Sequence, residues 1–451
     1  PVSPLEDLAA AGRVRLDAEG EAPIIAEGKK ARPDDLLTLV YTSGTTGEPK
    51  GAMLSHRNLF HVTDSVAGIL DFGPEDRSLV YLPLAHILQR YTLYLGLRVG
   101  GQGWYLSDIP RLGDVLAEVQ PTILAAVPRV LEKIHAKAMA RADDLDARKR
   151  KVFDWAFRVG HEVASATREG RTVSWWTRVK HRIADRIVFS KIKAKLGGRV
   201  RLVVSGGAPL SPHLSEWFHA AGLLVVEGYG LTETSAPATT CTHNAYRFGT
   251  VGKAIPGTDI VIADDGEILI KGPGVFSGYY RDQEATDAAF TANGYFRSGD
   301  IGHLDADGYL RITDRKKNII ITAGGKNIAP QPLENLLKEH PLIGQAMVFG
   351  DQKPYLVALL TLDPETLSEW AEHHGVEPSL EAVAAHPDVV AATDAWVESV
   401  NAQVARYESI KRWVLLPVAF VPENGYLTPT LKLKRRTIVQ DFGDAIDQLY
   451  R

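Results

Sequence analysis

Short apolar runs rich in β-branched residues alternate with amphipathic helical patterns from Leu37 to Val226. Such alternation predicts a mostly parallel sheet with helices packed on its faces. The strand-like runs read LTLVYT, SLVYLPL, GGQGWYL, PTILAAVP, RVRLVVSGG and GLLVVEGYG, and they end in loops rich in Gly, Ser or Thr. Because open α/β sheets bind ligands beyond the carboxyl ends of their strands, we expect the functional site along that edge.

The pattern changes three times along the chain. Residues 128–195 show helical spacing without a convincing strand, which predicts a helical insertion in the sheet. Residues 249–314 contain short strands and tight turns, with ADDGEILIKGPG and LDADGYLRITD as two hairpin corners, so a β-rich unit is expected. After Asp314 strands and helices mix again and end in a basic tail, which predicts a separate, smaller α+β domain.

Composition narrows the class of protein. With 451 residues, 45% of them hydrophobic and 24% charged, the chain should form a globular protein of more than one packed unit. A net charge of -4 gives no general attraction to nucleic acid, and the single Cys241 fits a reducing compartment, so we expect a cytoplasmic location. No apolar run reaches the roughly 18 residues of a membrane span. Since the chain starts at Pro1 and meets its first motif before residue 50, we expect an N-terminally truncated sequence.

The first motif is a loop of hydroxyls, glycines and one lysine, YTSGTTGEPKG at Tyr41 to Gly51. Glycines let backbone amides approach phosphate oxygens, hydroxyls add donors, and Lys50 adds positive charge, so the loop is interpreted as a phosphate cradle between a strand and the helix near Ser55. The spacing differs from that of a P-loop ATPase, and a flexible linker is the alternative. The expected ATP-binding residues here are Thr42, Ser43, Gly44, Thr45, Thr46, Gly47 and Lys50.

This loop resembles the signature of the AMP-forming adenylating enzymes, a family that includes acyl-CoA synthetases, luciferases and peptide-synthetase adenylation domains. Six further segments occur in the family's order, so the resemblance covers nearly the whole chain. They are LPLAH from Leu82, SGGAPL from Ser205, EGYGLTE from Glu227, YFRSGD from Tyr295, TDRKKNIIITAGGKNI from Thr313 and TPTLKLKR from Thr428.

The resemblance implies a site for ATP with Mg²⁺. The family's adenine segments correspond to Gly206, Gly207, Ala208, Gly228, Tyr229, Gly230, Leu231 and Thr232, with Tyr229 stacking on the base. Its ribose ligands correspond to Asp300 and Arg315, its metal ligands to Thr42 and Glu233, and its catalytic residues to Thr46, His86, Glu233 and Lys432. The residues alone leave other interpretations open. These are a tight turn for Gly206 and Gly207, a helix cap for Glu233, surface charges for Asp300 and Arg315, and a structural histidine for His86. Lys434 is the alternative to Lys432 as the catalytic lysine.

The resemblance also implies a second, mobile domain. The family's hinge corresponds to Lys317, which divides the chain into a large adenylating domain, 1–316, and a swivelling C-terminal domain, 317–451. In the family, rotation about the hinge removes the catalytic lysine and brings in a glycine loop that binds coenzyme A. That loop corresponds to Gly324, Gly325 and Lys326.

The expected activity is ATP-dependent conversion of a long-chain fatty acid to acyl-AMP, followed by transfer to coenzyme A. The helical insertion resembles long-chain members, although many of these carry a carboxylate where this chain has Gln89. Another acyl acceptor, or an impaired nucleotide-binding fragment, is the alternative. Residues 171–201 hold ten Lys or Arg against one acid, and Trp176, Val179, Ile183 and Ile187 share one helical face. They predict either peripheral contact with the inner face of the membrane or a helix packed on the domain.

Overall fold

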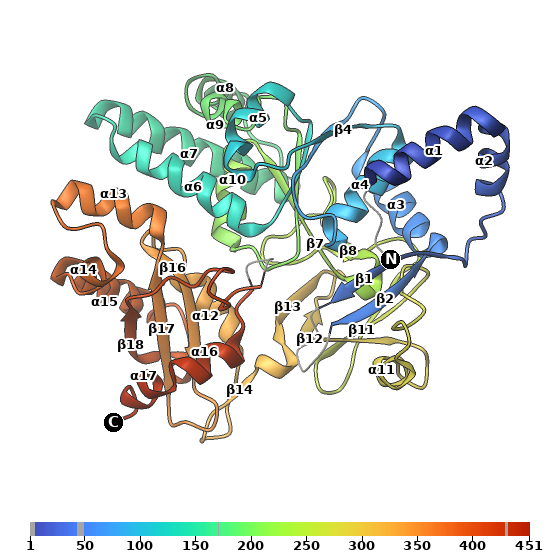
Figure 1. The fold of residues 1–451 in the computed structure, drawn as a ribbon. Coiled ribbons are helices and arrows are strands. Elements are labelled where there is room, and N and C mark those ends of the chain that lie inside the picture. The colour runs from blue at the N-terminus through green and yellow to red at the C-terminus, as the bar shows by residue number, and fades with distance from the viewer. Residues whose placement is uncertain (1–4, 43–48, 170, 429–431) are drawn as a thin grey trace.

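The computed structural model describes residues 5–42, 49–169, 171–428 and 432–451. The predicted phosphate-binding residues Ser43, Gly44, Thr45, Thr46 and Gly47 lie outside the described residues. The observed fold is α/β, with a large sheet domain followed by a smaller α+β part (Figure 1).

A seven-stranded sheet forms the centre of the large part, in the order β4-β3-β5-β6-β7-β8-β9. β4, β3, β5, β6 and β7 are parallel, and β8 and β9 add antiparallel pairs at one edge, so the predicted mostly parallel sheet is confirmed. The strands are β3 Arg77–Val80, β4 Gln102–Tyr105, β5 Ile123–Ala126, β6 Leu202–Ser205, β7 Leu224–Leu231, β8 Ala236–Thr240 and β9 Lys253–Ala254.

Helices cover both faces of this sheet, which is why its central strands are apolar at successive positions. Leu202 and Val203 are neighbours on β6, both fully buried, yet they belong to hydrophobic clusters on opposite faces. One face carries α3 His56–Leu70 and α4 Ile87–Val99. The other carries α5 Leu112–Val119, α6 Pro128–Asp143, α7 Ala147–Arg168, α8 Trp175–Ala184, α9 Ser190–Ala194 and α10 Pro212–Ala220, with the π-helical turn Asp185–Phe189 between α8 and α9.

The run LTLVYT does not join the parallel sheet, so its predicted place is wrong. It forms β1 Leu36–Thr42, which pairs antiparallel with β2 Lys50–Ser55 in a separate two-stranded sheet. The described ends of the predicted phosphate loop therefore lie on two paired strands, and β2 intervenes before the helix. Ser55 then caps α3, because its hydroxyl accepts the N–H of Asn58 and the Asn58 side chain accepts the N–H of Ser55.

The predicted β-rich unit contains a four-stranded antiparallel sheet in the order β10-β11-β12-β13. Its two expected hairpins are confirmed, and Asp300 lies within β12. Phe296, Ser298 and Asp300 alternate with more exposed neighbours, and this period of two places Asp300 on the buried face. The elements are β10 Asp259–Ile262, β11 Glu267–Lys271, α11 Gln283–Ala289, β12 Phe296–Leu304 and β13 Leu310–Arg315.

The C-terminal part has its own cores on both faces of a three-stranded sheet in the order β16-β17-β18. It meets the large part through an ion pair of Arg129 with Asp363 and a hydrogen bond of Ser211 with Glu339. The elements are β14 Ile320–Ile321, β15 Asn327–Ile328, α12 Pro330–Leu337, β16 Ile343–Phe349, β17 Leu356–Leu362, α13 Pro364–His374, α14 Leu380–Ala384, α15 Pro387–Asn401, β18 Ile410–Leu416, α16 Arg435–Asp441 and α17 Gly443–Gln448. At the other end of the sequence, α1 Leu5–Glu19 and α2 Glu21–Gly28 precede β1.

Candidate active site

A buried carboxylate lies where the β-rich sheet meets the carboxyl end of β7. Asp300 is 4% exposed; its Oδ2 accepts the Tyr229 hydroxyl at 2.7 Å and its Oδ1 lies 2.7 Å from Arg315 Nε. Asp300 and Arg315 are direct partners across β12 and β13, which fixes their separation. Burial raises the pKa of Asp300, although the charges of Arg315 and Lys432 act in the opposite direction. The structure thus joins three predicted nucleotide-binding residues into one unit.

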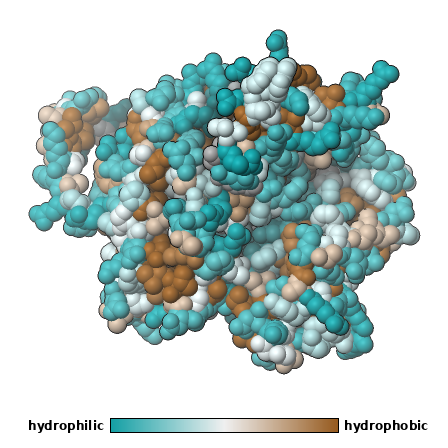
Figure 2. Space-filling view, turned by 180° about the vertical axis from the view of Figure 1, so that it is seen from behind, coloured by the Kyte–Doolittle hydropathy of each residue, from teal (hydrophilic) through white to brown (hydrophobic). Residues whose placement is uncertain are grey.

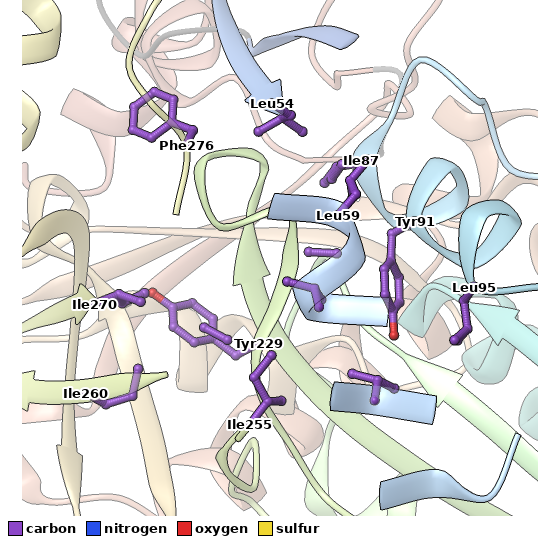
Figure 3. Packing of buried hydrophobic residues seen from close by; sticks show 14 of the residues in the cluster. Leu54, Leu59, Ile87, Tyr91, Leu95, Tyr229, Ile255, Ile260, Ile270 and Phe276 are labelled. Atoms are coloured by element: carbon purple, nitrogen blue, oxygen red, sulfur yellow. The ribbon is translucent and has the colours of Figure 1, made fainter. Parts of the chain in front are cut away.

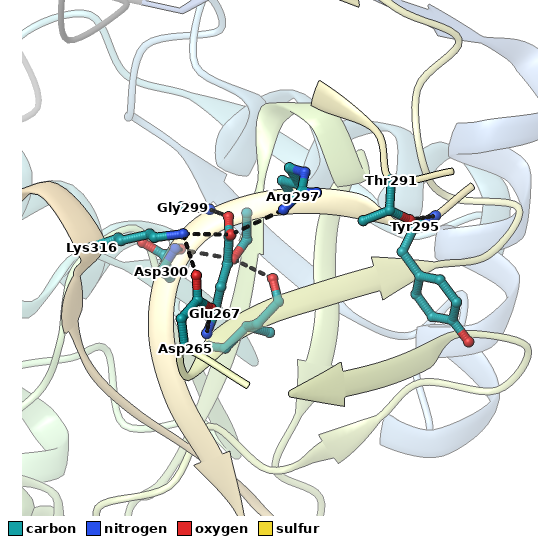
Figure 4. A network of polar contacts seen from close by, with 10 residues as sticks. Asp265, Glu267, Thr291, Tyr295, Arg297, Gly299, Asp300 and Lys316 are labelled. Carbon is teal, nitrogen blue, oxygen red and sulfur yellow. Dashed lines mark hydrogen bonds and ion pairs between the residues drawn. The ribbon is translucent and has the colours of Figure 1, made fainter. Parts of the chain in front are cut away.

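A second layer of polar contacts fixes the strand that carries Asp300 (Figure 4). Glu267, 3% exposed, accepts the backbone N–H of Gly299 at 3.0 Å and lies 3.0 Å from Lys316 Nζ. Ser298 Oγ accepts the N–H of Asp300 and donates to the carbonyl of Ile268 at 2.6 Å. Because each buried polar group has a partner, the Asp300 side chain is held in a single position.

Three cations converge on Asp300. Lys432 and Lys317 both keep an exposed surface. Partial desolvation of each ammonium group by the surrounding protein, together with the charge of Arg315, still lowers the pKa of each lysine. Asp300 and Glu233 act on Lys432 in the opposite direction, so both carboxylates lie within its electrostatic range. A site crowded with positive charge favours an anionic ligand, because such a ligand relieves the mutual repulsion.

Lys432 comes from the C-terminal part, and its neighbours anchor it there. Its backbone N–H donates to Thr428 Oγ1 at 3.0 Å, and its carbonyl accepts the N–H of Thr428 at 2.8 Å. Three residues later, Arg435 forms a two-pronged ion pair with the buried Glu334 of α12, at 2.5 and 2.6 Å. The charge of Lys432 acts on the pKa of both Asp300 and His86, which places Lys432 within electrostatic range of both side chains.

Glu233 forms the opposite wall of the site. It lies in the 3₁₀ turn Thr232–Thr234 after β7, is 8% exposed, and accepts the Tyr279 hydroxyl at 2.8 Å. Lys50 lies 5.4 Å from the centre of the same Tyr279 ring, and Thr42 faces Lys50 across the β1–β2 hairpin. Tyr279 therefore links the lysine of the predicted phosphate loop to the predicted metal carboxylate. Sequence reasoning missed this tyrosine because an aromatic residue in a loop gives no charge signal.

The donors near Glu233 suit Mg²⁺ bound mainly by ligand oxygens and water. Among the described residues, no group of three or more His, Cys, Asp or Glu side chains could hold a metal by itself. Mg²⁺ is usually coordinated by one or two carboxylates together with substrate phosphates and water. The single buried carboxylate of Glu233 fits this coordination pattern.

A mostly apolar cavity that opens to solvent lies beside α4 and the central strands, and His86, the N-cap of α4, is part of its lining. Burial and the charge of Lys432 lower the pKa of His86. The loop after β6 supplies Gly206 and Gly207, and β7 supplies Gly228 and Gly230. An added Cβ on Gly230 would lie 1.8 Å from the carbonyl oxygen of Ala236, so close strand contact alone requires that glycine.

Gln89 is a structural residue. It is 2% exposed, accepts the backbone N–H groups of Tyr81 and Leu82 at 3.3 and 3.1 Å, and donates to Thr92 at 2.8 Å. These hydrogen bonds of the neutral Gln89 amide take the place of the ion pair that a carboxylate at this position would form.

Strand β7 carries a further buried glutamate, Glu227. Burial raises the pKa of Glu227 to about 8. No role was predicted for this glutamate.

The remaining predicted residues lie at different distances from the cluster. Ala208 is exposed in the loop after β6, Leu231 ends β7, and Thr232 begins the turn that carries Glu233. The predicted coenzyme A loop is not brought to the cluster: Gly324, Gly325 and Lys326 form the exposed turn between β14 and β15, where Lys326 lies 5.6 Å from the ring of Tyr407.

This arrangement, with Asp300 and Arg315 on the large part and Lys432 on the C-terminal part within electrostatic range, suits an enzyme that binds an anionic ligand. Residues 5–280 match the model of the AMP-binding enzyme family, and residues 317–451 match that of the AMP-binding enzyme C-terminal domain. The chain belongs to this family.

Curated relatives and solved structures agree with this assignment. The chain is 42% identical to the long-chain-fatty-acid–CoA ligase FadD15 of Mycobacterium bovis, over 95% of this chain and 72% of that protein. It is 36% identical to the peroxisomal long chain acyl-CoA synthetase 6 of Arabidopsis thaliana, over 93% of this chain and 61% of that protein. The adenylation domain of a carboxylate reductase from Mycobacterium chelonae shares the fold, with a TM-score of 0.70 at 24% identity over 99% of this chain and 67% of that chain.

Proposed function

We propose that this enzyme activates a long-chain fatty acid with ATP, releases pyrophosphate, and transfers the acyl group from acyl-AMP to coenzyme A. The observation that carries the proposal is the meeting of two environments at His86. On one side lies the charged cluster of Asp300, Arg315, Lys317 and Lys432, and on the other lies the apolar cavity. An acid with a long alkyl chain and an anionic phosphate fit these two sides.

The side chains act mainly by position and charge. Asp300 accepts hydrogen bonds from the ribose hydroxyls, and Arg315 holds that carboxylate in place. Lys432 donates to the negative charge that develops on the α-phosphate and acyl oxygens as the carboxylate attacks phosphorus and pyrophosphate leaves. Thr42 and Glu233 would hold Mg²⁺, which neutralises phosphate charge when bound. Lys50 and the predicted loop residues Ser43, Gly44, Thr45, Thr46 and Gly47 bind the departing phosphates.

Thioester formation requires a second arrangement of the same two domains, 1–316 and 317–451. The arrangement with Lys432 beside His86 suits adenylation, whereas the glycine turn at Gly324 and Gly325 is exposed and free to approach coenzyme A. Rotation about Lys317 would exchange one for the other. Lys317 lies within the electrostatic range of Asp300 and Lys432, which supports a place for the proposed hinge near the cluster.

A coupled assay tests this function. We expect AMP and pyrophosphate release that depends on a fatty acid, on ATP and on Mg²⁺, with acyl-CoA as the product. Replacing coenzyme A by an acyl carrier protein or an amine in the same assay tests the alternative acceptor. Acyl-AMP formation without acyl-CoA formation would contradict the proposed acceptor, and the absence of both would contradict the proposed function.

The helix α8 offers a surface for a membrane that holds the fatty acid. Its described residues include a stacked pair, Trp175 and Trp176, with ring centres 3.7 Å apart, and these rings are 61% and 59% exposed. Ile183 and Ile187 are 46% and 45% exposed, whereas Thr177 and Ala184 are buried, so α8 packs on the domain by one face and leaves part of its apolar surface exposed. Figure 2 shows hydrophobic patches scattered among hydrophilic surface on one face of the molecule. None of the helices among the described residues is both long enough and apolar enough to span a bilayer.

We expect the protein to float with vesicles that contain an anionic phospholipid, and the double substitution Trp175→Ala and Trp176→Ala to reduce the bound fraction by roughly tenfold. The reason is that interfacial tryptophans and nearby basic residues together provide the affinity of such a helix. Trp104→Ala on β4, where the ring is 49% exposed, is the matched control and should float like the native protein. Equal flotation of the double variant would exclude α8 as the contact.

A further inference from the structure

The apolar cavity follows α4 along its length. Its lining includes Ile87, Leu88, Tyr91, Leu95 and Val99, which run from the first to the last turn of the helix. Figure 3 shows Ile87, Tyr91 and Leu95 along this helix, pointing into the buried cluster. The cavity therefore has one end at the His86 N-cap, where the charge of Lys432 acts on the imidazole, and a far end near the C-terminus of the helix.

Gly96 lines the same cavity within the last turns of α4. Glycine destabilises the interior of a helix relative to alanine, so its presence there requires a reason. The backbone of Gly96 does not have a positive φ, so no turn requires the glycine. A Cβ built on Gly96 meets no heavy atom within 4 Å, so the space beside it is open. Gly101 differs, because its added Cβ would lie 3.2 Å from the carbonyl oxygen of Asp76.

The position of Gly96 can be converted into an acyl chain length. It comes ten residues after His86 on one helix, and a rise of 1.5 Å per residue gives an axial separation of about 15 Å. An extended alkyl chain advances roughly 1.25 Å per bond, because each bond of about 1.52 Å is inclined to the chain axis. A chain that runs beside α4 from a carboxylate at His86 therefore passes Gly96 near its twelfth carbon.

We propose that Gly96 is a specificity-determining residue that keeps the acyl cavity open to chains longer than about twelve carbons. This inference rests on the proposed function, since it assumes that the cavity binds the fatty acid. A side chain at position 96 would occupy the space of the outer methylenes, while the carboxylate end and the nucleotide site stay unchanged.

The test compares Gly96→Leu with Gly68→Leu. Gly68 is the matched control: it lies in the last turn of α3, is exposed, and an added Cβ there also meets no atom within 4 Å. For Gly96→Leu we expect kcat/KM with a 16-carbon acid to fall by at least about tenfold, because a few methylenes in a hydrophobic pocket change discrimination by that factor. With an 8-carbon acid kcat/KM should stay at the native value, and Gly68→Leu should keep the native profile for both.

Binding measured without turnover separates this inference from the proposed function. A fluorescent 16-carbon acid should bind the native protein and Gly68→Leu, and bind Gly96→Leu at least about tenfold more weakly, while displacement by an 8-carbon acid is unchanged. An unchanged chain-length profile in Gly96→Leu, or an equal loss for both acids, would overturn the role of Gly96. Native protein that binds the probe but forms no acyl-CoA with any acid would contradict the proposed function alone. Thermal unfolding of both variants verifies that they fold.

Discussion

Lys432→Ala is expected to slow acyl-AMP formation by about 10²- to 10³-fold, the usual cost of removing one preorganised donor from a developing oxyanion. Thioester formation from supplied acyl-AMP should continue at the native rate, because that step uses the arrangement without Lys432. The structural basis is that the ammonium group of Lys432 lies within the fields of Asp300, Glu233 and Arg315. Pyrophosphate release and acyl-CoA release, measured separately, report the two steps.

Lys434→Ala is the control for this variant. Lys434 is exposed two residues away in the same basic run and should leave both steps unchanged. Equal loss of both steps in Lys432→Ala would contradict the exchange of arrangements. Loss of adenylation in Lys434→Ala would instead reassign the catalytic lysine.

The same lysine gives adenylation an expected alkaline limit. Lys432 must be protonated to stabilise the transition state, and burial with the charge of Arg315 lowers its pKa below the ordinary 10.5. Since the ammonium form is present below the pKa and lost above it, kcat/KM for ATP should fall as pH rises through this lowered value. Lys432→Arg, which stays charged, should move that fall to higher pH if it retains activity.

Asp300→Asn is expected to raise the KM for ATP by about 10- to 100-fold, because a hydrogen bond to a charged group contributes about 1.5–3 kcal/mol. In the native protein the Tyr229 hydroxyl lies 2.7 Å from Asp300 Oδ2, and the oxygen of the new side-chain amide can still accept this hydrogen bond. The amide loses the ion pair with Arg315, however, and binds ribose hydroxyls more weakly. Isothermal titration with AMP measures the binding loss directly.

Asp307→Asn is the matched control on the same hairpin. Its carboxylate is 64% exposed and pairs with Arg247 at 2.7 Å, outside the site, so AMP affinity should equal that of the native protein. Unchanged AMP affinity in Asp300→Asn would show that this carboxylate supports the β12–β13 hairpin without touching the nucleotide.

Much of the fold follows from the sequence because periodicity is local. The parallel strands β3, β5, β6 and β7 and the two hairpins of the β-rich unit match the runs from which they were predicted. The failure at LTLVYT has a clear reason: an apolar run predicts a strand but does not specify its partner, and here the partner is the next strand, β2, across a loop.

The sequence by itself determined which residue types the site contains, since Glu233, Asp300, Arg315 and Lys432 all occur in ordered motifs. Only the tertiary structure decided how they act together. Asp300, which as a charged residue would ordinarily be exposed, is buried under Tyr229, and Tyr279 joins Glu233 to Lys50. The charge of Lys432 acts on His86 although 346 positions separate their numbers. Burial, desolvation and contacts between distant segments depend on packing, and local spacing does not encode them.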